Sequence, residues 1–251
     1  MNSNLFIIEL KKINCFLRIL VNDIPVFSHM GAKVLEMKIP INQFLINGSN
    51  NIEIVVLPSM DNATISDNTI CKISIKNTNK DLPILEYSTP DFSGKSEKYF
   101  DKKIEFSLTI SKNPYFINTP DLNESFEQEI YNFYKKIWDI CNRKQVTEFF
   151  ELHEFKDLEI AAYYNLTYRE RVDDLRPVFE RILADKEMKL QPLDFSKFKI
   201  TYYHNNKIVT IEDDLNNPVI YFESNDDQVT SKFKIPVFLC LNETKQLIII
   251  R

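Results

Sequence analysis

Residues 39–57 read IPINQFLINGSNNIEIVVL, and they join a loop around Gly48 to a run in which polar and apolar residues alternate. Glycine is favoured where a turn needs a left-handed backbone conformation. Alternation with a period of two is typical of a strand with one face in the core and one in solvent. The segment therefore predicts a tight turn and then a β-strand that buries Ile52, Ile54 and Val56.

The same alternation runs through most of the first half of the chain. Asn22 and Asp23 supply a turn between two such runs, because both residue types tolerate turn conformations. Further strands are expected at residues 15–21, 24–27, 35–39, 71–75 and 104–110. Short strands separated by Asn, Asp, Pro and Ser, without a helical pattern, predict an antiparallel, jelly-roll-like β-sandwich over residues 1–112.

Residues 113–121 interrupt this period. They contain Pro114 and Pro120, and proline is a strong marker of loops and boundaries. We interpret the segment as a linker to a second domain, residues 122–251.

The second domain opens with a helical pattern. Helical stretches are expected at residues 126–141, 146–162, with a break after Leu152, and 167–183. Thr167 with Glu170, and Asp121 with Glu124, have the spacing of a capping box. Pro177 lies inside the third stretch and should kink or restart that helix, because it lacks a backbone donor.

From residue 195 the period of two returns. Strands are expected at residues 198–204, 207–211, 219–224, 232–241 and 246–251. The pairs Asn205–Asn206 and Asn242–Glu243 suit hairpin turns. Three helices followed by an antiparallel meander predict an α+β domain.

Composition narrows the possible functions. The net charge of −5 argues against a general nucleic-acid binder, which needs a basic surface. Three glycines and three histidines among 251 residues leave little material for phosphate-binding loops or histidine-rich metal sites, so we expect no cofactor and no metal. The cysteines form no C-x-x-C motif and are expected to be buried free thiols: Cys15, Cys71, Cys141 and Cys240.

Charge and targeting signals give two further expectations. Residues 118–251 carry 18 Lys/Arg and 24 Asp/Glu, a net charge of −6, and such a surface attracts basic partners. The N-terminus lacks the features of a signal peptide, and no apolar stretch is long enough to span a bilayer. We therefore expect a soluble cytoplasmic protein, or a periplasmic one if Met1 has replaced a signal peptide.

The turn of residues 39–57 also carries a family resemblance. Gly48, Asn50, Ile52 and Ile54 resemble the x-G-x-N-x-I-x-I element of galactose-binding-like sandwich folds. Many members of that group bind carbohydrate through exposed aromatic residues, which the resemblance implies here as an alternative function. The first half of the chain has no tryptophan, which argues against sugar binding.

The second domain is similar to the NTF2-like fold. The likeness rests on the order of its elements and on residues 130–152, IYNFYKKIWDICNRKQVTEFFEL. In that fold a curved sheet wraps a long helix and leaves a conical pocket, and members include lyases and isomerases as well as proteins without catalysis. No motif unites the enzymes, so the resemblance implies no catalytic residue. The two-domain combination also resembles small bacterial proteins that accompany secreted toxins.

A catalytic site would need an acid/base pair, most often a histidine with a carboxylate. The candidate pocket residues are His153, with Asp157 one helical turn later, and His204, with Tyr202. Histidine is often partly buried in a structural role, and we favour that interpretation for both.

A protein partner would need a different surface. Four carboxylates on the third helix are candidate binding residues: Glu170, Asp173, Asp174 and Glu180. Tyrosine and tryptophan are frequent interface anchors, and the first helix adds Tyr131, Tyr134 and Trp138.

The sequence thus predicts a two-domain bacterial protein that binds a protein partner without catalysis. The specific form expected is an immunity or accessory protein that occludes a toxin or effector. A small-ligand or carbohydrate-binding protein is the first alternative, and an NTF2-like lyase or isomerase using His153 or His204 is the second.

Overall fold

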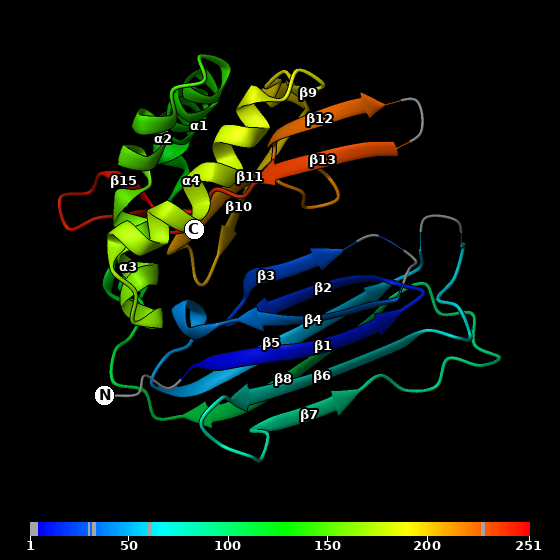
Figure 1. Cartoon of the computed structure of the whole chain (residues 1–251). Coiled ribbons are helices and arrows are strands. Elements are labelled where there is room, and N and C mark those ends of the chain that lie inside the picture. Colours follow the sequence, from blue (N-terminus) through cyan, green and yellow to red (C-terminus); the bar gives the residue numbers. More distant parts are fainter. Residues whose placement is uncertain (1–4, 30, 32–33, 60–61, 227–228) are drawn as a thin grey trace. The chain divides into compact units, whose positions relative to one another are not determined.

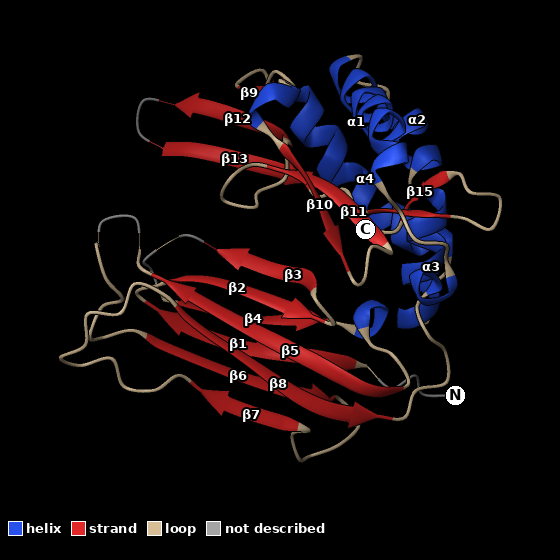
Figure 2. Cartoon of the chain, turned by 180° about the vertical axis from the view of Figure 1, so that it is seen from behind, coloured by secondary structure: helices blue, strands red, loops and turns tan. Residues whose placement is uncertain are grey.

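The computed structural model describes the whole chain except residues 1–4, 30, 32–33, 60–61 and 227–228. The chain divides into two compact units, Met1–Pro114 and Tyr115–Arg251. The division falls within the linker expected at residues 113–121. In the described part, the protein is mixed α/β, with four antiparallel sheets and four α-helices (Figures 1 and 2).

The first unit contains two four-stranded sheets, in the orders β4-β1-β6-β7 and β3-β2-β5-β8. Its elements are β1 (Phe6–Ile13), β2 (Phe16–Val21), β3 (Ile24–His29), β4 (Leu35–Pro40), the 3-10 turn η1 (Asn42–Phe44), β5 (Gly48–Leu57), β6 (Ile70–Asn77), β7 (Leu85–Ser88) and β8 (Phe100–Leu108).

Alternation along the strands divides buried from exposed residues, as expected from the sequence. In β1, Ile8 and Leu10 lie opposite Ile75 and Ile73 of β6, and all four are buried. The expected strands are present, but β1 and β7 were not predicted. In β1 the alternation is hidden by consecutive apolar residues at its start and by Lys12, which takes a place in the buried row.

Lys12 is completely buried. Its Nζ donates hydrogen bonds to the carbonyl oxygen of Cys15, at 2.6 Å, and to that of Gly31. Burial lowers the pKa of Lys12 below its ordinary value. A lysine in this environment is rare, and its presence explains why the sequence pattern of β1 does not indicate a strand.

The Gly48 turn is held by a buried asparagine side chain. Gly48 has φ 103°, a conformation that favours glycine. The Asn50 Nδ2 group donates to the carbonyl oxygens of Ile46 and Gly48, at 2.9 and 3.0 Å. Its Oδ1 accepts from the Ile46 amide and from Asn22 Nδ2, both at 2.8 Å. Asn50 therefore joins the two turns that the sequence predicted.

We expect Asn50→Ala to lower the free energy of unfolding of the first unit by about 2–3 kcal/mol, because both backbone groups of Ile46 lose their partner. Urea unfolding followed by circular dichroism measures the change. Trp138, the only tryptophan, lies in the second unit, so its fluorescence transition should not move. A loss below about 0.5 kcal/mol, the size usual for a surface substitution, would contradict this role for Asn50.

The second unit places four helices before its main sheets. Its helical elements are η2 (Tyr115–Asn118), η3 (Glu124–Phe126), α1 (Glu127–Asn142), α2 (Val146–Leu152), α3 (Glu154–Tyr164), α4 (Tyr168–Ala184) and η4 (Phe195–Lys197). Its strands are β9 (Met188–Leu190), β10 (Lys199–Tyr203), β11 (Ile208–Glu212), β12 (Ile220–Asp226), β13 (Val229–Ile235), β14 (Leu239–Leu241) and β15 (Leu247–Ile249).

The expected break divides the second of the three helical stretches into two separate helices, which makes four. His153 leaves the helical conformation, with φ −94° and ψ 1°, and so separates α2 from α3. The capping box at Thr167 and Glu170 is confirmed. The helix α4 continues through Pro177 without a restart. At the first helix the expected capping box is absent, and Asn123 caps η3 instead.

The strands form two sheets rather than one continuous meander. Their orders are β10-β11-β14-β15 and β13-β12-β9. The run expected at residues 232–241 is divided into β13 and β14, and Pro236 lies between them. Proline cannot donate to a strand ladder, which accounts for the interruption. The short strand β9 pairs with β12 and was not predicted.

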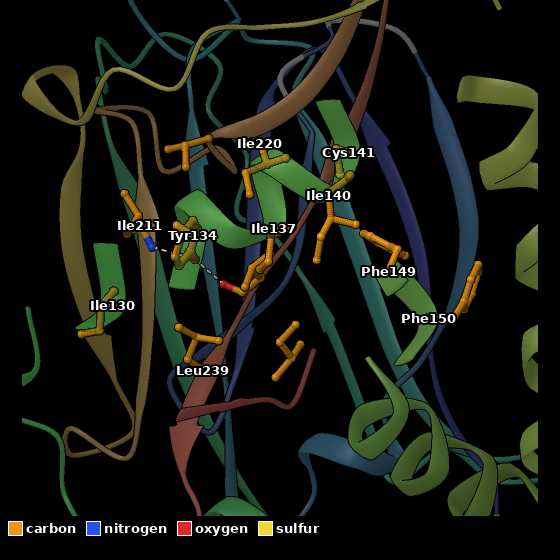
Figure 3. Packing of buried hydrophobic residues seen from close by; sticks show 14 of the residues in the cluster. Ile130, Tyr134, Ile137, Ile140, Cys141, Phe149, Phe150, Ile211, Ile220 and Leu239 are labelled. Carbon is orange, nitrogen blue, oxygen red and sulfur yellow. Dashed lines mark hydrogen bonds between the residues drawn. The ribbon is translucent and has the colours of Figure 1, made fainter. Parts of the chain in front are cut away.

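Tyr134 of α1 connects the helical layer to the strands (Figure 3). Its ring is buried. Its hydroxyl donates to the Val237 carbonyl oxygen at 2.6 Å and accepts from the Ile211 amide at 2.9 Å. Thr210 Oγ1 lies 2.9 Å from the same hydroxyl. One side chain thus satisfies polar groups on two segments of the chain that would otherwise be buried without partners.

We expect Tyr134→Phe to lower the free energy of unfolding of the second unit by about 2–3 kcal/mol, since the ring remains but buried polar groups lose a partner. Trp138 fluorescence in urea reports the change. Trp138→Phe is unsuitable as a control because it removes the probe, so Tyr131→Phe, at a half-buried position on the same helix, provides the comparison. Equal effects of the two variants would show that the Tyr134 hydroxyl has no special role.

Candidate functional site

The four candidate pocket residues lie in different surroundings. His153 and Asp157 lie at the junction of α2 and α3. Tyr202 is in β10, where burial and then the charges of Glu127 and Glu124 raise the pKa of its hydroxyl. His204 follows β10, and its ring packs edge-on to Phe116 at 5.2 Å. The structure therefore shows no common pocket built from these four residues in the part of the chain that it describes.

His153 is enclosed by the helices. It is 1% exposed, its Nδ1 lies 2.7 Å from the Phe149 carbonyl oxygen, and its ring stacks on Phe149 at 4.0 Å. Burial, together with the nearby charge of Lys156, holds the pKa of His153 well below its ordinary value. The imidazole is therefore neutral at pH 7 and, being enclosed, is placed for packing rather than for contact with a substrate.

This environment gives a specific pH dependence. In the unfolded chain His153 takes up a proton near its ordinary pKa of 6.5, whereas the folded state resists protonation. The unfolded state then binds more protons, so stability is present above pH 6.5 and falls as the pH is lowered. Between pH 7 and 5 the loss from this residue should be about 1–2 kcal/mol.

His153→Leu should remove this contribution. Urea unfolding followed by Trp138 fluorescence at pH 7 and pH 5 gives the free energies of unfolding, and the variant should show a smaller difference between the two. His29 lies in the first unit, so its titration should not affect the Trp138 signal. An unchanged difference would show that His153 is protonated equally in both states.

Asp157 forms the centre of a buried charge cluster. Asp157 is fully buried, and its Oδ1 lies 3.6 Å from both Lys156 Nζ and Arg171 Nε. Neither carboxylate oxygen has a hydrogen-bond partner within the described residues. Burial lowers the pKa of Lys156, and the charge of Asp157 partly opposes that effect. A buried carboxylate needs cations nearby, so Asp157 draws Lys156 and Arg171 away from the surface.

The four candidate carboxylates lie on the exposed side of α4. They are Glu170, Asp173, Asp174 and Glu180. The helix also has four arginines, but two of them turn toward the protein. Arg171 approaches Asp157, and the guanidinium of Arg176 lies over the Phe150 ring at 5.0 Å from its centre. We call the four carboxylates the acidic face.

The ion pairs on this face are exposed and long. Arg169 Nε lies 3.6 Å from Asp173 Oδ2, and the two side chains are 90% and 67% exposed. Arg176 Nη1 lies 4.0 Å from Glu180 Oε1. Ion pairs of this kind contribute little to the stability of the protein, because water solvates both charges. The Glu170 carboxylate already accepts hydrogen bonds from the amide and hydroxyl of Thr167. The exposed Arg169 and Arg181 offset part of the negative charge of the acidic face.

The candidate aromatic residues have structural contacts. Tyr134 is buried as described above, which leaves it unavailable to a partner. Tyr131 packs on Phe195 with ring centres 4.7 Å apart. The half-buried Trp138 donates from Nε1 to the Gln191 carbonyl oxygen at 2.8 Å. All three help to hold α1 in place.

An apolar surface on α3 was not predicted from the sequence. Phe155 and Leu158 are 36% and 48% exposed, and Leu166, just beyond the helix, is 38% exposed. Neither Phe155 nor Leu166 was singled out in the sequence, because helical spacing alone does not show which side of a helix faces outward. The charged residue Asp157 occupies the buried side instead.

Two of the depressions on the described surface of the first unit lie beside β1 and β6. The larger, of about 580 Å³, is lined mostly by charged residues: Glu9, Lys11, Glu36, Lys38 and Lys72. Glu9 pairs with Lys76 at 2.5 Å and with Lys38 at 3.3 Å. None of the described residues lining either depression is aromatic. Carbohydrate sites usually present rings for stacking, so these depressions give no support to sugar binding.

Comparisons with protein-family models, with curated proteins and with solved structures found no match to this chain. Within the described ranges, no helix is long and apolar enough to cross a membrane. Nor do the described side chains include a group of three or more His, Cys, Asp or Glu residues placed to hold a metal ion.

Proposed function

We propose that this chain is a protein-binding module that works without catalysis. The observation that carries the proposal is the acidic face of α4, whose arginines are partly withdrawn into the protein by Asp157 and Phe150. Residues 118–251 have a net charge of −6, and residues 115–117 are uncharged. The whole unit, residues 115–251, therefore also has a net charge of −6. A surface of one sign accelerates encounter with partners of the opposite sign.

The specific form we propose is an immunity or accessory protein that occludes a bacterial toxin or effector. An acidic helix is complementary to the basic surfaces with which enzymes hold phosphate groups. We further propose that the first unit is a β-sandwich of the galactose-binding-like kind and that the second is related to the NTF2-like fold. The paired four-stranded sheets and the order of helices before strands support these assignments.

The acidic face can be tested by charge reversal. Asp173→Lys with Asp174→Lys should slow association with a partner co-purified from the native host by about tenfold at low ionic strength. The effect should shrink at physiological salt, because screening weakens long-range attraction. Surface plasmon resonance gives the two rate constants separately. The melting temperature should stay nearly unchanged, since both residues are exposed.

A matched control carries the same change in charge elsewhere. Asp67→Lys with Asp81→Lys alters two exposed residues of the first unit. Equal slowing by both double variants would attribute the effect to net charge alone. An unaltered on-rate in the α4 variant at low ionic strength would refute binding through the acidic face.

A further inference from the structure

The helix α3 is built with its charges inward and part of its apolar surface outward. Asp157 is fully buried and the Lys156 side chain is only 15% exposed. Phe155 and Leu158 are exposed. The helix also buries Ile160 and Ala161, so it has apolar residues on both its buried and its exposed side, which is unusual for a surface helix. Large exposed apolar side chains that cluster on one face often mark an interaction site.

The exposed apolar residues form a continuous line. Successive residues of an α-helix rotate by about 100°, so Phe155, Leu158 and Ala162 fall within about 60° of one another. Ala162 is also exposed. Leu166 follows the end of the helix, where its amide donates to the Ala161 carbonyl oxygen at 2.9 Å and keeps it beside the last turn. We call Phe155, Leu158, Ala162 and Leu166 the α3 stripe.

Carboxylates of α3 flank this stripe, whereas the lysine of α3 turns inward. The same rotation places Glu154 on one flank and Glu159 on the other. Glu154 is exposed, and Glu159 is half-buried and accepts the Tyr115 amide at 2.7 Å. The only lysine of α3 is Lys156, which lies 3.6 Å from Asp157. The stripe is therefore an apolar surface bordered by negative charge.

We propose that the α3 stripe is the docking site for a basic amphipathic helix of a partner protein. The inference deepens the proposed function and rests on it. Apolar anchors spaced three to four residues apart are the features that a helix of a partner recognises. Lysines or arginines beside the apolar face of such a helix would meet Glu154 and Glu159. A second copy of this chain would oppose carboxylate to carboxylate, and an anionic lipid surface would repel both.

The first test asks whether the stripe is accessible in the full chain. Leu158→Cys should react with a maleimide as fast as Leu215→Cys, a control at a 53% exposed leucine elsewhere in the same unit. The native cysteines are all buried, so they should contribute only slow labelling. Protection of the cysteine at position 158 alone would show that the chain itself or a second copy covers the stripe, and would overturn the proposal.

The second test measures recognition. The probe is a fluorescent synthetic peptide of leucine and lysine, roughly 18 residues long so that it can hold a helix, with its leucines on one face. Fluorescence anisotropy should show binding to the full chain. A peptide with glutamate in place of lysine should bind at least tenfold more weakly. Leu158→Ser should weaken binding of the lysine peptide about tenfold, and Leu215→Ser less than twofold.

Several results would overturn the inference. Equal binding of the two peptides, or unchanged affinity in Leu158→Ser, would show that the stripe is not the site. A dimer in light scattering that Leu158→Ser abolishes would identify a second copy as the occupant. Binding to phosphatidylserine vesicles that requires Leu158 would identify a membrane surface instead.

The two proposals can fail separately. Loss of partner association in the Asp173→Lys, Asp174→Lys variant, with no effect of Leu158→Ser on peptide binding, would keep the acidic face and reject the stripe. Peptide binding that depends on Leu158, with partner association unaffected by the α4 variant, would give the opposite result.

Discussion

The burial of the Asp157 carboxylate is the constraint on which the outer surface of the second unit depends. A carboxylate without hydrogen-bond donors needs opposite charge nearby, and Lys156 and Arg171 supply it at 3.6 Å. These two cations are consequently only partly exposed, with side-chain exposures of 15% and 27%. What remains outside is the acidic face of α4 and the apolar stripe of α3. Burial of Asp157 therefore reduces the positive charge on the part of the surface that a partner would contact.

The core gives this surface a fixed support. The Tyr134 hydroxyl links α1 to Ile211 and Val237 of the strand region, while Phe149 and Phe179 stack at 4.1 Å between α2 and α4. The break at His153 redirects the chain between α2 and α3, and its neutral ring packs against Phe149. A rigid support lowers the entropy cost of binding, because the surface is already ordered.

Much of this architecture follows from local sequence rules. The Gly48 turn, the alternating strands and the Thr167 capping box were predictable because each depends on residues close in the chain. The features that escaped prediction depend on distant partners. Strand β1 looks irregular until carbonyl groups around Lys12 accept its ammonium. In α3 a buried position belongs to Asp157, which lies 3.6 Å from Arg171 on another helix. The spacing of Phe155 and Leu158 alone could therefore not show which side faces outward.

Docking of a basic helix on the α3 stripe, as we propose, can be tested most directly by amide hydrogen exchange on the full chain, with and without the leucine–lysine peptide. Exchange reports local opening along the whole backbone. The account predicts slower exchange confined to residues 151–181 when the peptide is bound, with the first unit unchanged. Protection concentrated in residues 1–114, or spread evenly over both units, would contradict it.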